Sequence, residues 1–538
     1  MPRRLALALL AFGAGVALFV SAAFAHPQGQ SRRGGTLRLL WSIEPDSVDP
    51  ALATGSRGSS MLLFAVCAKL FNTLGDPETG RPPIVKEVVR SYTVSTDGRT
   101  YTFELKRTFR FHTSERVTAQ SFADAFNRNA RLGQTSFASR RGFMDEIAGA
   151  KAAIAGRATS ISGVQVLGRF RLRIRLTRPA GDFVARLTMW SFCPILPGTP
   201  IEPAGIDKPP ASGPYYVAEH VANRLIRLER NPNYHGGRTA NPDHIVWTID
   251  ADAGERLRAT EEDRNDFTPV FAYPDAVVHR LADKYGVNRP GGQLLRTPSG
   301  LTNYGFAFNP WPNRPALAGR GQAPLRKAIN FALDRRALAA THPYLTVRRT
   351  DRLLPAPLTQ APQLYPLSGP DLTAARKWLA RAKRRPRELT LYAPNNFPWS
   401  VASARVFTAN LKELGIDVTT RYFDFTTLGE KLRKPGEPWD VAWLPWGAWY
   451  LDPAGAILPL LRDTRYEARI NAVNQVAGPG RAKAWADLEA DLMRNDPPVA
   501  TYADAMSLVL VSPSLGCLGE TLAQYELDLG TVCKLNRR

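Results

Sequence analysis

The densest group of side chains suited to gripping a small molecule lies in residues 443–453. Their sequence is Trp-Leu-Pro-Trp-Gly-Ala-Trp-Tyr-Leu-Asp-Pro, so four of the eleven residues are aromatic. Aromatic rings bury a large area with few rotatable bonds, which suits a cleft that closes on a guest. We therefore expect ligand contacts from Trp446, Gly447, Trp449, Tyr450 and Asp452. The alternative is that these rings fill an interior and that Asp452, which precedes a proline, serves a turn.

Groups for catalysis or metal binding do not form a recognisable motif. The sequence has no Gly-x-Ser-x-Gly, no His-Glu-x-x-His and no phosphate-binding loop. Its seven histidines show no spacing typical of metal ligands. We expect no enzyme activity, no metal and no cofactor. An exported hydrolase is the less favoured alternative, because a sequence cannot show which distant residues meet in space.

Four cysteines, Cys67, Cys193, Cys517 and Cys533, predict disulfides if the chain is exported. Three pairings are formally open. Proximity favours Cys517 with Cys533, which leaves Cys67 with Cys193, and closing the 16-residue loop would stabilise by about 3 kcal/mol in the chain-entropy model. Four buried free thiols are the alternative.

Export is predicted by the N-terminus. Residues 1–4 include two arginines, residues 5–19 are apolar, and Ala23-Phe24-Ala25 offers a small-residue cleavage site. Residues 1–25 therefore read as a signal peptide, with an uncleaved N-terminal anchor as the alternative. We expect a periplasmic or cell-surface protein at the outer face of the cytoplasmic membrane.

The net charge of the 538-residue chain is unusually positive, at +22 with a pI near 10.1. Its basic residues are mostly dispersed arginines, so we expect no nucleic-acid function. A solvated basic surface that contacts anionic lipid is the preferred interpretation.

The pattern of apolar residues predicts a mixed α/β chain of two or more lobes. An Asp-Gly hairpin is expected around residues 92–105 and another at 164–176, and Thr118 is expected to cap a helix. A parallel βαβ unit is predicted from three segments, namely a strand at 389–392, a helix at 399–414 and a strand at 416–422. Other expected elements are strands at 36–41, 439–444 and 498–511 and helices at 58–70 and 481–494.

Four stretches in the right order resemble the family 5 extracellular solute-binding proteins of peptide, nickel and oligopeptide ABC importers. They are Gly34–Arg38 with Glu44–Pro50, Ser95–Leu105 continuing to Val117-Thr118-Ala119, Ser212–Tyr215 with Leu228–Tyr234, and Leu325–Arg335. The similarity extends over residues 34–515, nearly the whole mature chain.

This resemblance implies a periplasmic-binding-protein fold of type II, in which two lobes close on a solute like a Venus flytrap. It places residues 36–71, 189–299 and 503–538 in lobe I, residues 72–188 in a small inserted domain and residues 300–502 in lobe II. It also implies delivery of the solute to an ABC permease and its ATPase, by a binding protein that we expect to be a monomer.

The resemblance also bears on the solute. In peptide-binding relatives an Asp at the position of Trp449 receives the α-ammonium group of the peptide. Because this chain has Trp there, a peptide solute is less strongly expected than the family resemblance alone implies. A sugar or other neutral solute, a nickel complex, and a sensor or chaperone that acts without a transporter are alternatives. Further cleft contacts are expected from residues at the edges of the lobes: Trp41, Ser42, Asn303, Tyr304, Asn395 and Trp399.

Overall fold

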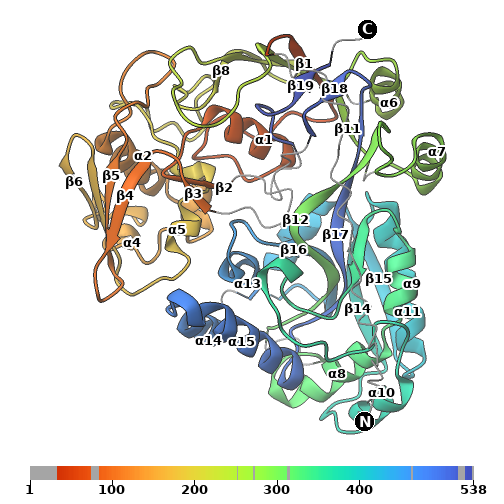
Figure 1. The fold of residues 1–538 in the computed structure, drawn as a ribbon. Coiled ribbons are helices and arrows are strands. Elements are labelled where there is room, and N and C mark those ends of the chain that lie inside the picture. Colours follow the sequence, from red (N-terminus) through yellow and green to blue (C-terminus); the bar gives the residue numbers. More distant parts are fainter. Residues whose placement is uncertain are drawn as a thin grey trace, which may run out of the picture.

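The computed structural model describes residues 33–73, 84–250, 252–270, 273–311, 316–434, 436–461, 464–518 and 527–535 (Figure 1). The expected signal peptide or anchor at residues 1–25 lies outside them. Across these ranges no helix combines the length and the apolar character needed to cross a bilayer. The described strands form three larger sheets and two short ladders.

The first sheet has the strand order β1-β10-β9-β8, with β1 parallel to β10 and the other pairs antiparallel. Alternation along β1 turns Leu37, Leu39 and Trp41 into the core, as its sequence predicts. The strands are β1 (Thr36–Trp41), β8 (Tyr215–Val221), β9 (Leu225–Arg230) and β10 (His244–Ile249).

Helix α1 (Arg57–Val66) packs beneath this sheet with nine of its ten residues buried. Its N-terminus is capped by the side chain of Ser56, which accepts from the Ser59 N–H. The sequence predicted a helix to residue 70, but it ends at Val66. The Val66 carbonyl accepts from the Gly213 N–H at 2.8 Å, and Cys67 is extended because it is bonded to Cys193.

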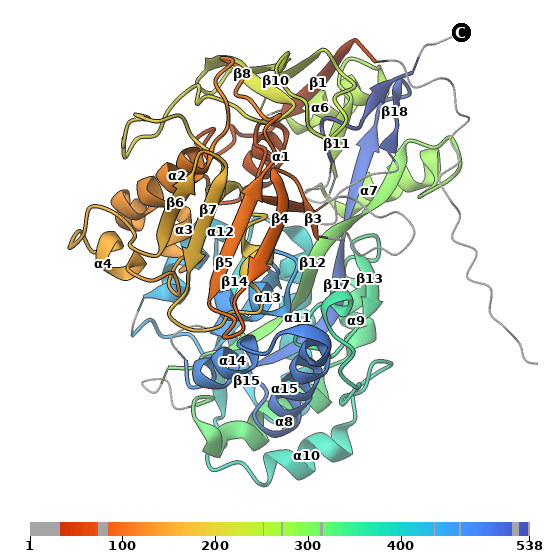
Figure 2. The same cartoon turned by 60° about the vertical axis from the view of Figure 1, so that its left-hand side comes forward.

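The second sheet, of order β4-β5-β7-β6, is antiparallel throughout. Both of its hairpins were predicted, and Gly98 supplies the positive φ of +69° at the first turn. Thr118 caps α2, which packs against β6 and β7. Figure 2 shows the four strands side by side in orange and yellow. The elements are β4 (Val89–Val94), β5 (Thr100–Leu105), β6 (Val164–Gly168), β7 (Arg171–Arg175), α2 (Ala119–Arg131), α3 (Phe137–Arg140), α4 (Ala150–Ile154) and α5 (Phe183–Arg186).

The third sheet has the order β11-β17-β12-β16-β14-β15, with β13 also on β17. The predicted βαβ unit is confirmed, since β14 and β15 are parallel and α11 connects them. Strands β12 and β17 are the longest, at 15 and 13 residues, and run lengthwise through the molecule (Figure 1). The strands are β11 (Phe267–Pro269), β12 (Leu294–Phe308), β13 (Thr346–Arg349), β14 (Glu388–Pro394), β15 (Asp417–Phe423), β16 (Val441–Gly447) and β17 (Val499–Val511).

Ten helices described in this part of the chain accompany the third sheet. They are α6 (Ala253–Glu261), α7 (Asp275–Tyr285), α8 (Ala323–Ala332), α9 (Arg335–Ala340), α10 (Leu372–Leu379), α11 (Pro398–Lys412), α12 (Phe425–Arg433), α13 (Pro453–Leu461), α14 (Glu467–Asn474) and α15 (Arg481–Asn495). Single 3₁₀ turns occupy Gly133–Thr135, Trp190–Phe192, Arg320–Gln322, Ala356–Leu358 and Gly478–Gly480.

Two disulfides join the cysteines in the pairing that proximity favoured. Cys67 bonds Cys193 and Cys517 bonds Cys533, with Cα–Cα distances of 5.7 and 5.4 Å. The second disulfide lies in the ladder of β18 (Leu515–Gly516) with β19 (Cys533–Lys534), and the other short ladder pairs β2 (Phe71–Thr73) with β3 (Ile84–Lys86).

The hydrophobic interior divides into two large clusters. One joins the first and second sheets and includes Phe64 and Phe103, whereas the other surrounds β12, β14 and β16 and includes Phe306 and Trp443. Tyr450, which follows β16, belongs to the first cluster, as do residues at one end of the third sheet on β11, β12 and β17. The loop after β16 therefore connects the two halves of the molecule.

Candidate ligand-binding site

The loop after β16 leaves the third sheet beside β12. The Ala448 N–H donates to the Leu301 carbonyl at 2.9 Å. Gly447 allows this approach, since a Cβ there would lie 2.4 Å from the same oxygen. Helix α13 does not begin until Pro453, so the intervening residues are free of helical constraints and can extend beyond their own lobe.

Trp449 is enclosed by residues from the N-terminal third of the chain. Its ring lies 5.1 Å from the Phe137 ring in an edge-to-face arrangement, and the Arg141 guanidinium lies 5.0 Å from the ring centroid. Gly55 makes room for the indole, because a Cβ at that position would lie 2.5 Å from it. Trp449, in the loop that follows a strand of the third sheet, is thus half-buried against the parts of the chain that contain the first and second sheets.

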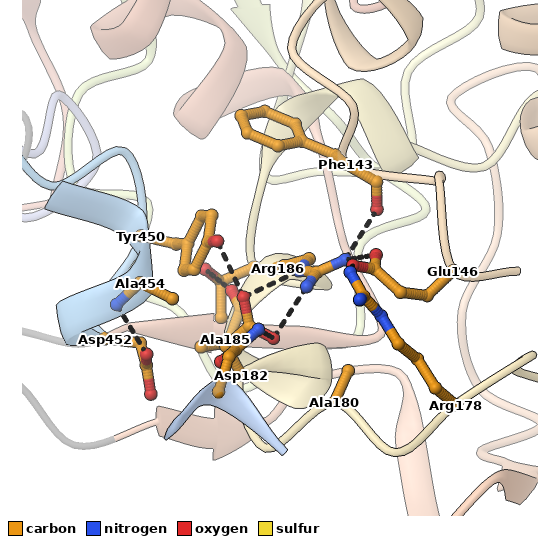
Figure 3. Close-up of polar contacts among 12 residues, drawn as sticks. Phe143, Glu146, Arg178, Ala180, Asp182, Ala185, Arg186, Tyr450, Asp452 and Ala454 are labelled. Carbon is orange, nitrogen blue, oxygen red and sulfur yellow. Dashed lines mark hydrogen bonds and ion pairs between the residues drawn. The ribbon is translucent and has the colours of Figure 1, made fainter. Parts of the chain in front are cut away.

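Tyr450 extends the same contact into a buried polar network (Figure 3). Its hydroxyl donates to Asp182 Oδ2 at 2.7 Å, and its ring packs edge-on to Phe143 at 5.8 Å. Asp182 also accepts from the Asn474 side-chain amide at 3.0 Å, and the Gly181 N–H donates to the Asn474 carbonyl at 2.8 Å. Burial, reinforced by the Asp182 charge, raises the pKa of Tyr450 well above its ordinary value.

Asp182 is neutralised within its own segment. Arg186, one helical turn later, donates to both of its carboxylate oxygens at 2.7 and 2.8 Å. Arg186 also contacts Glu146, which accepts from Arg178 at 2.9 Å (Figure 3). Burial would raise the pKa of Glu146, but the two guanidinium groups outweigh burial and lower it to about 2.

Asp452 is likewise paired inside its own lobe. Arg481 donates to its two oxygens at 2.6 and 3.0 Å and to the Asn474 side-chain oxygen at 2.8 Å. Burial raises the pKa of Asp452, and the ion pair with Arg481 opposes that effect. Asp452 therefore positions α13 and Asn474 rather than presenting a charge to a guest.

A cavity of about 350 Å³ opens next to this network. Its lining comes from both sides: Arg141, Phe143, Glu146, Lys151, Arg178 and Arg186 from the second sheet's segment, and Tyr450, Leu458, Glu467 and Asn471 from the third sheet's. That volume lies within the usual range for small-molecule sites. Its walls are mostly polar and charged, which suits a polar guest.

Residues 83–468 match the family described as "Bacterial extracellular solute-binding proteins, family 5 Middle". The chain belongs to this family.

This binding protein is also similar to individual curated sequences. Protein XP55 of Streptomyces lividans is 22% identical over 95% of this chain and 88% of its own length. A putative ABC transporter peptide-binding protein of Brucella ovis is 24% identical over 66% of this chain and 63% of its own length.

Solved structures share the two-lobed fold. Clavulanic acid biosynthesis oligopeptide binding protein 2 superposes with a TM-score of 0.79 at 22% identity, covering 94% of this chain and 96% of that one. The Escherichia coli murein tripeptide binding protein MppA gives a TM-score of 0.69 at 21% identity, with 94% and 99% covered.

The residues expected to line the cleft of this binding protein fall into separate groups. Trp449, Tyr450 and Asp452 come together with Gly447 at the junction described above. Ser42 and Asn395 are exposed, and the Asn395 N–H donates to the Phe423 carbonyl at 2.8 Å.

Tyr304 and Trp399 meet in an aromatic cluster on one face of the third sheet. Their rings lie 5.0 Å apart, and Trp443, Tyr502 and His342 complete the cluster. Both side chains are at least 94% buried, and burial raises the pKa of Tyr304 to about 12.

Three further expected residues pack within the interior. Trp446 Nε1 donates to the Leu353 carbonyl at 2.8 Å, and the Asn303 amide donates to the same oxygen at 3.3 Å. Trp41 packs edge-on to Trp247 at 5.2 Å.

Sequence reasoning did not identify Phe137, Arg141, Asp182 or Asn474. None stands in a motif or a periodic pattern, and Asp182 and Asn474 are 292 residues apart. Only the fold brings them beside the loop after β16. Among the described residues there is no cluster of His, Cys, Asp or Glu able to hold a metal ion.

Proposed function

We propose that this protein captures a peptide or similar small solute outside the cytoplasmic membrane and delivers it to an ABC permease with its ATPase. Membership of the solute-binding family supports the capture role. Relatives named as ABC transporter peptide-binding proteins support the transporter and the solute class. The single observation that carries the proposal is the loop after β16, which brings Trp449 against Phe137 and Arg141 of the other half.

The proposed division into bodies follows the resemblance: lobe I from residues 36–71, 189–299 and 503–538, an inserted domain at 72–188, and lobe II at 300–502. The three larger sheets fit this division, with β12 and β17 as the connecting strands. A solute between the bodies would stabilise the closed arrangement by its higher affinity for it.

The polar network supports reversible closure. Hydrogen bonds that join residues 181–182 to lobe II run from Tyr450 and Asn474 to Asp182 and from Gly181 to Asn474. Each carboxylate keeps its own guanidinium on its own side, because Asp182 pairs with Arg186 and Asp452 with Arg481. Opening would therefore break hydrogen bonds but would leave no buried charge unpaired. An unpaired buried charge would be strongly destabilising.

The guanidinium group of Arg141 beside Trp449 supports a particular kind of solute. A buried ammonium group needs a nearby counter-charge, but Arg141 places a cation on this indole ring. We infer that the end of the solute at Trp449 is neutral or anionic. This observation also favours a second candidate, a sugar or other neutral solute stacked on the indole.

Native mass spectrometry of the purified protein tests the proposal by identifying a solute that co-purifies. Calorimetry then compares di- to pentapeptides, their N-acetylated forms and disaccharides. Binding of peptides, with the acetylated form at least as tight as the free form, is the expected result. Binding of disaccharides alone would select the second candidate, and binding of neither class would contradict the proposal.

Trp449→Ala is expected to weaken that binding at least about tenfold, or 1.4 kcal/mol, because the indole contributes contact area at the closure. Trp378→Ala is the matched control. Its ring also carries cations, with Lys327 at 4.1 Å and Arg381 at 4.9 Å, but it lies on α10. Unchanged affinity in Trp449→Ala, measured by calorimetry, would exclude this loop from the site.

A further inference from the structure

The positive charge of the chain is concentrated in the segment that contains the second sheet. Residues 84–188 hold 19 Lys and Arg against 8 Asp and Glu, so they carry half of the chain's formal charge of +22 in about a fifth of its length. The basic residues of the chain are therefore not evenly dispersed, because this segment holds more than its share of them.

The two faces of the second sheet differ sharply. On β7, Leu172 and Ile174 are buried and face the core, whereas Arg171, Arg173 and Arg175 alternate with them and point outward. The cross-strand neighbours of the arginines are small or polar, namely Glu104, Thr102 and Thr100 on β5 and Gln165 on β6. We call this outward face the arginine face.

The arginine face points away from the ligand junction. Its opposite face carries Tyr101, whose ring lies 4.8 Å from Phe183 of α5, and α5 also supplies Arg186 to the junction. A partner on the arginine face would therefore leave the Trp449 loop accessible.

Most of this charge is not neutralised by the protein. Arg171 pairs with Glu104 at 3.0 Å, but in the described parts of the chain no ion pair joins Arg173 or Arg175 to a carboxylate. Arg107 and Arg169 add charge at the end of the sheet, where both guanidinium groups lie over the Phe170 ring at 5.7 and 5.6 Å. Arg171 and Arg175 are exposed and Arg173 is half-buried, so the face presents a row of cations to solvent.

We propose that the arginine face binds the anionic headgroups of a lipid bilayer. A row of arginines along one strand of a sheet matches an extended negative surface better than a single small anion, and guanidinium pairs well with phosphate. Each arginine near such a surface contributes roughly a fivefold increase in partitioning. Three arginines would give about a hundredfold increase, which screening by salt reduces.

Sedimentation of the full chain with vesicles tests this proposal. Vesicles of phosphatidylcholine alone are compared with vesicles containing phosphatidylglycerol, at low and high NaCl. The readout is the ratio between the two vesicle types, compared between each variant and the wild type, because residues 1–32 with Arg3, Arg4 and Arg32 are the same in all of them. We expect a strong preference for phosphatidylglycerol at low salt that falls at high salt.

Arg171→Gln, Arg173→Gln and Arg175→Gln in one variant should lower this preference at least tenfold. The control, Lys383→Gln with Arg384→Gln and Arg385→Gln, removes the same charge from an exposed run after α10 and should change it less than twofold. A double variant, Arg173→Gln with Arg175→Gln, keeps the Glu104 pair and guards against misfolding of the triple variant, which circular dichroism would reveal.

Equal losses in the test and control variants would overturn the proposal, since net charge alone would then explain binding. Tighter binding to double-stranded DNA than to the anionic vesicles would also overturn it. Calorimetry with the co-purified solute separates this proposal from the function above, because the triple variant should keep its solute affinity.

Discussion

The loops that follow β14 and β16 begin at neighbouring strand ends yet behave in opposite ways. After β14, helix α11 begins at Pro398, so Trp399 is held on the helix and packs onto its own sheet. After β16, five residues separate Gly447 from Pro453, and their aromatic side chains reach the other half of the molecule. An aromatic residue at a strand end is therefore not enough to predict a contact with the other half of the molecule. Its distance from the next helix start decides whether it can leave its lobe.

Trp399→Ala tests the first half of this comparison and should have the largest effect. Removal of a 96% buried indole from a packed cluster should lower the free energy of unfolding by about 3 to 5 kcal/mol, measured by urea denaturation. Tyr422→Ala is the comparison variant, because it removes a large ring that is 38% exposed on β15 and should cost far less. Normal stability with lost solute binding in Trp399→Ala would move Trp399 from the core to the cleft.

The same cluster should make stability depend on pH. Burial lowers the pKa of His342 to about 4, against 6.5 for the free side chain, while its ring contacts the Tyr502 hydroxyl at 3.0 Å. Between these two values the unfolded chain binds more protons than the folded one, so stability falls as pH falls. Between pH 7 and 5 we expect a loss of about 2 kcal/mol from this group.

His342→Gln should remove this contribution, because glutamine does not titrate, and should leave the opposite contribution of buried Glu489, whose pKa is raised to about 7. His279→Gln changes an exposed histidine in the same way and should leave the slope as in the wild type. Urea denaturation at pH 7, 6 and 5 provides the measurement. A wild-type slope in His342→Gln would mean that the ring is not held neutral in the interior.

Local signals in the sequence predicted much of the fold. The alternation of β1, the Asp-Gly turn, the Thr118 cap and the βαβ unit each depend on residues close together in the chain. β16 was expected at residues 439–444 but runs from Val441 to Gly447, through Pro445. Proline lacks a backbone N–H, but β14 pairs with β16 only at Val441 and Ala442. Beyond Ala442 the edge of β16 that faces β14 therefore needs no N–H donor, and Pro445 is tolerated.

The candidate site was predicted only on one side. The aromatic run at residues 443–453 identified the loop after β16, because its composition is unusual by itself. Its neighbours Phe137, Arg141 and Asp182 are ordinary residues in ordinary contexts, and their importance arises from long-range packing. For the same reason, the sequence could not show that Tyr304 and Trp399 pack against each other in the interior of the third sheet.

Tyr450→Phe tests the second half of the comparison with the smallest expected effect. It removes one hydrogen bond across the boundary, from the Tyr450 hydroxyl to Asp182, while keeping the ring against Phe143. A hydrogen bond to a charged group is worth about 1.5 to 3 kcal/mol, and Asp182 retains Arg186 and Asn474, so we expect a shift near the lower end. Small-angle scattering should show a larger radius of gyration without solute, and calorimetry with the co-purified solute a correspondingly weaker affinity.

Tyr365→Phe provides the control for that experiment. Its hydroxyl donates to the Met493 carbonyl at 2.6 Å, a buried hydrogen bond that lies entirely within the proposed lobe II. Both variants lose a buried phenolic hydrogen bond, so both should lose some stability. Only Tyr450→Phe should change the radius of gyration, because only its bond joins segments that separate when the protein opens. An equal change in both variants would mean that the hydrogen bond from Tyr450 to Asp182 does not stabilise a closed arrangement. The loops after β14 and β16 would then differ in position but not in function.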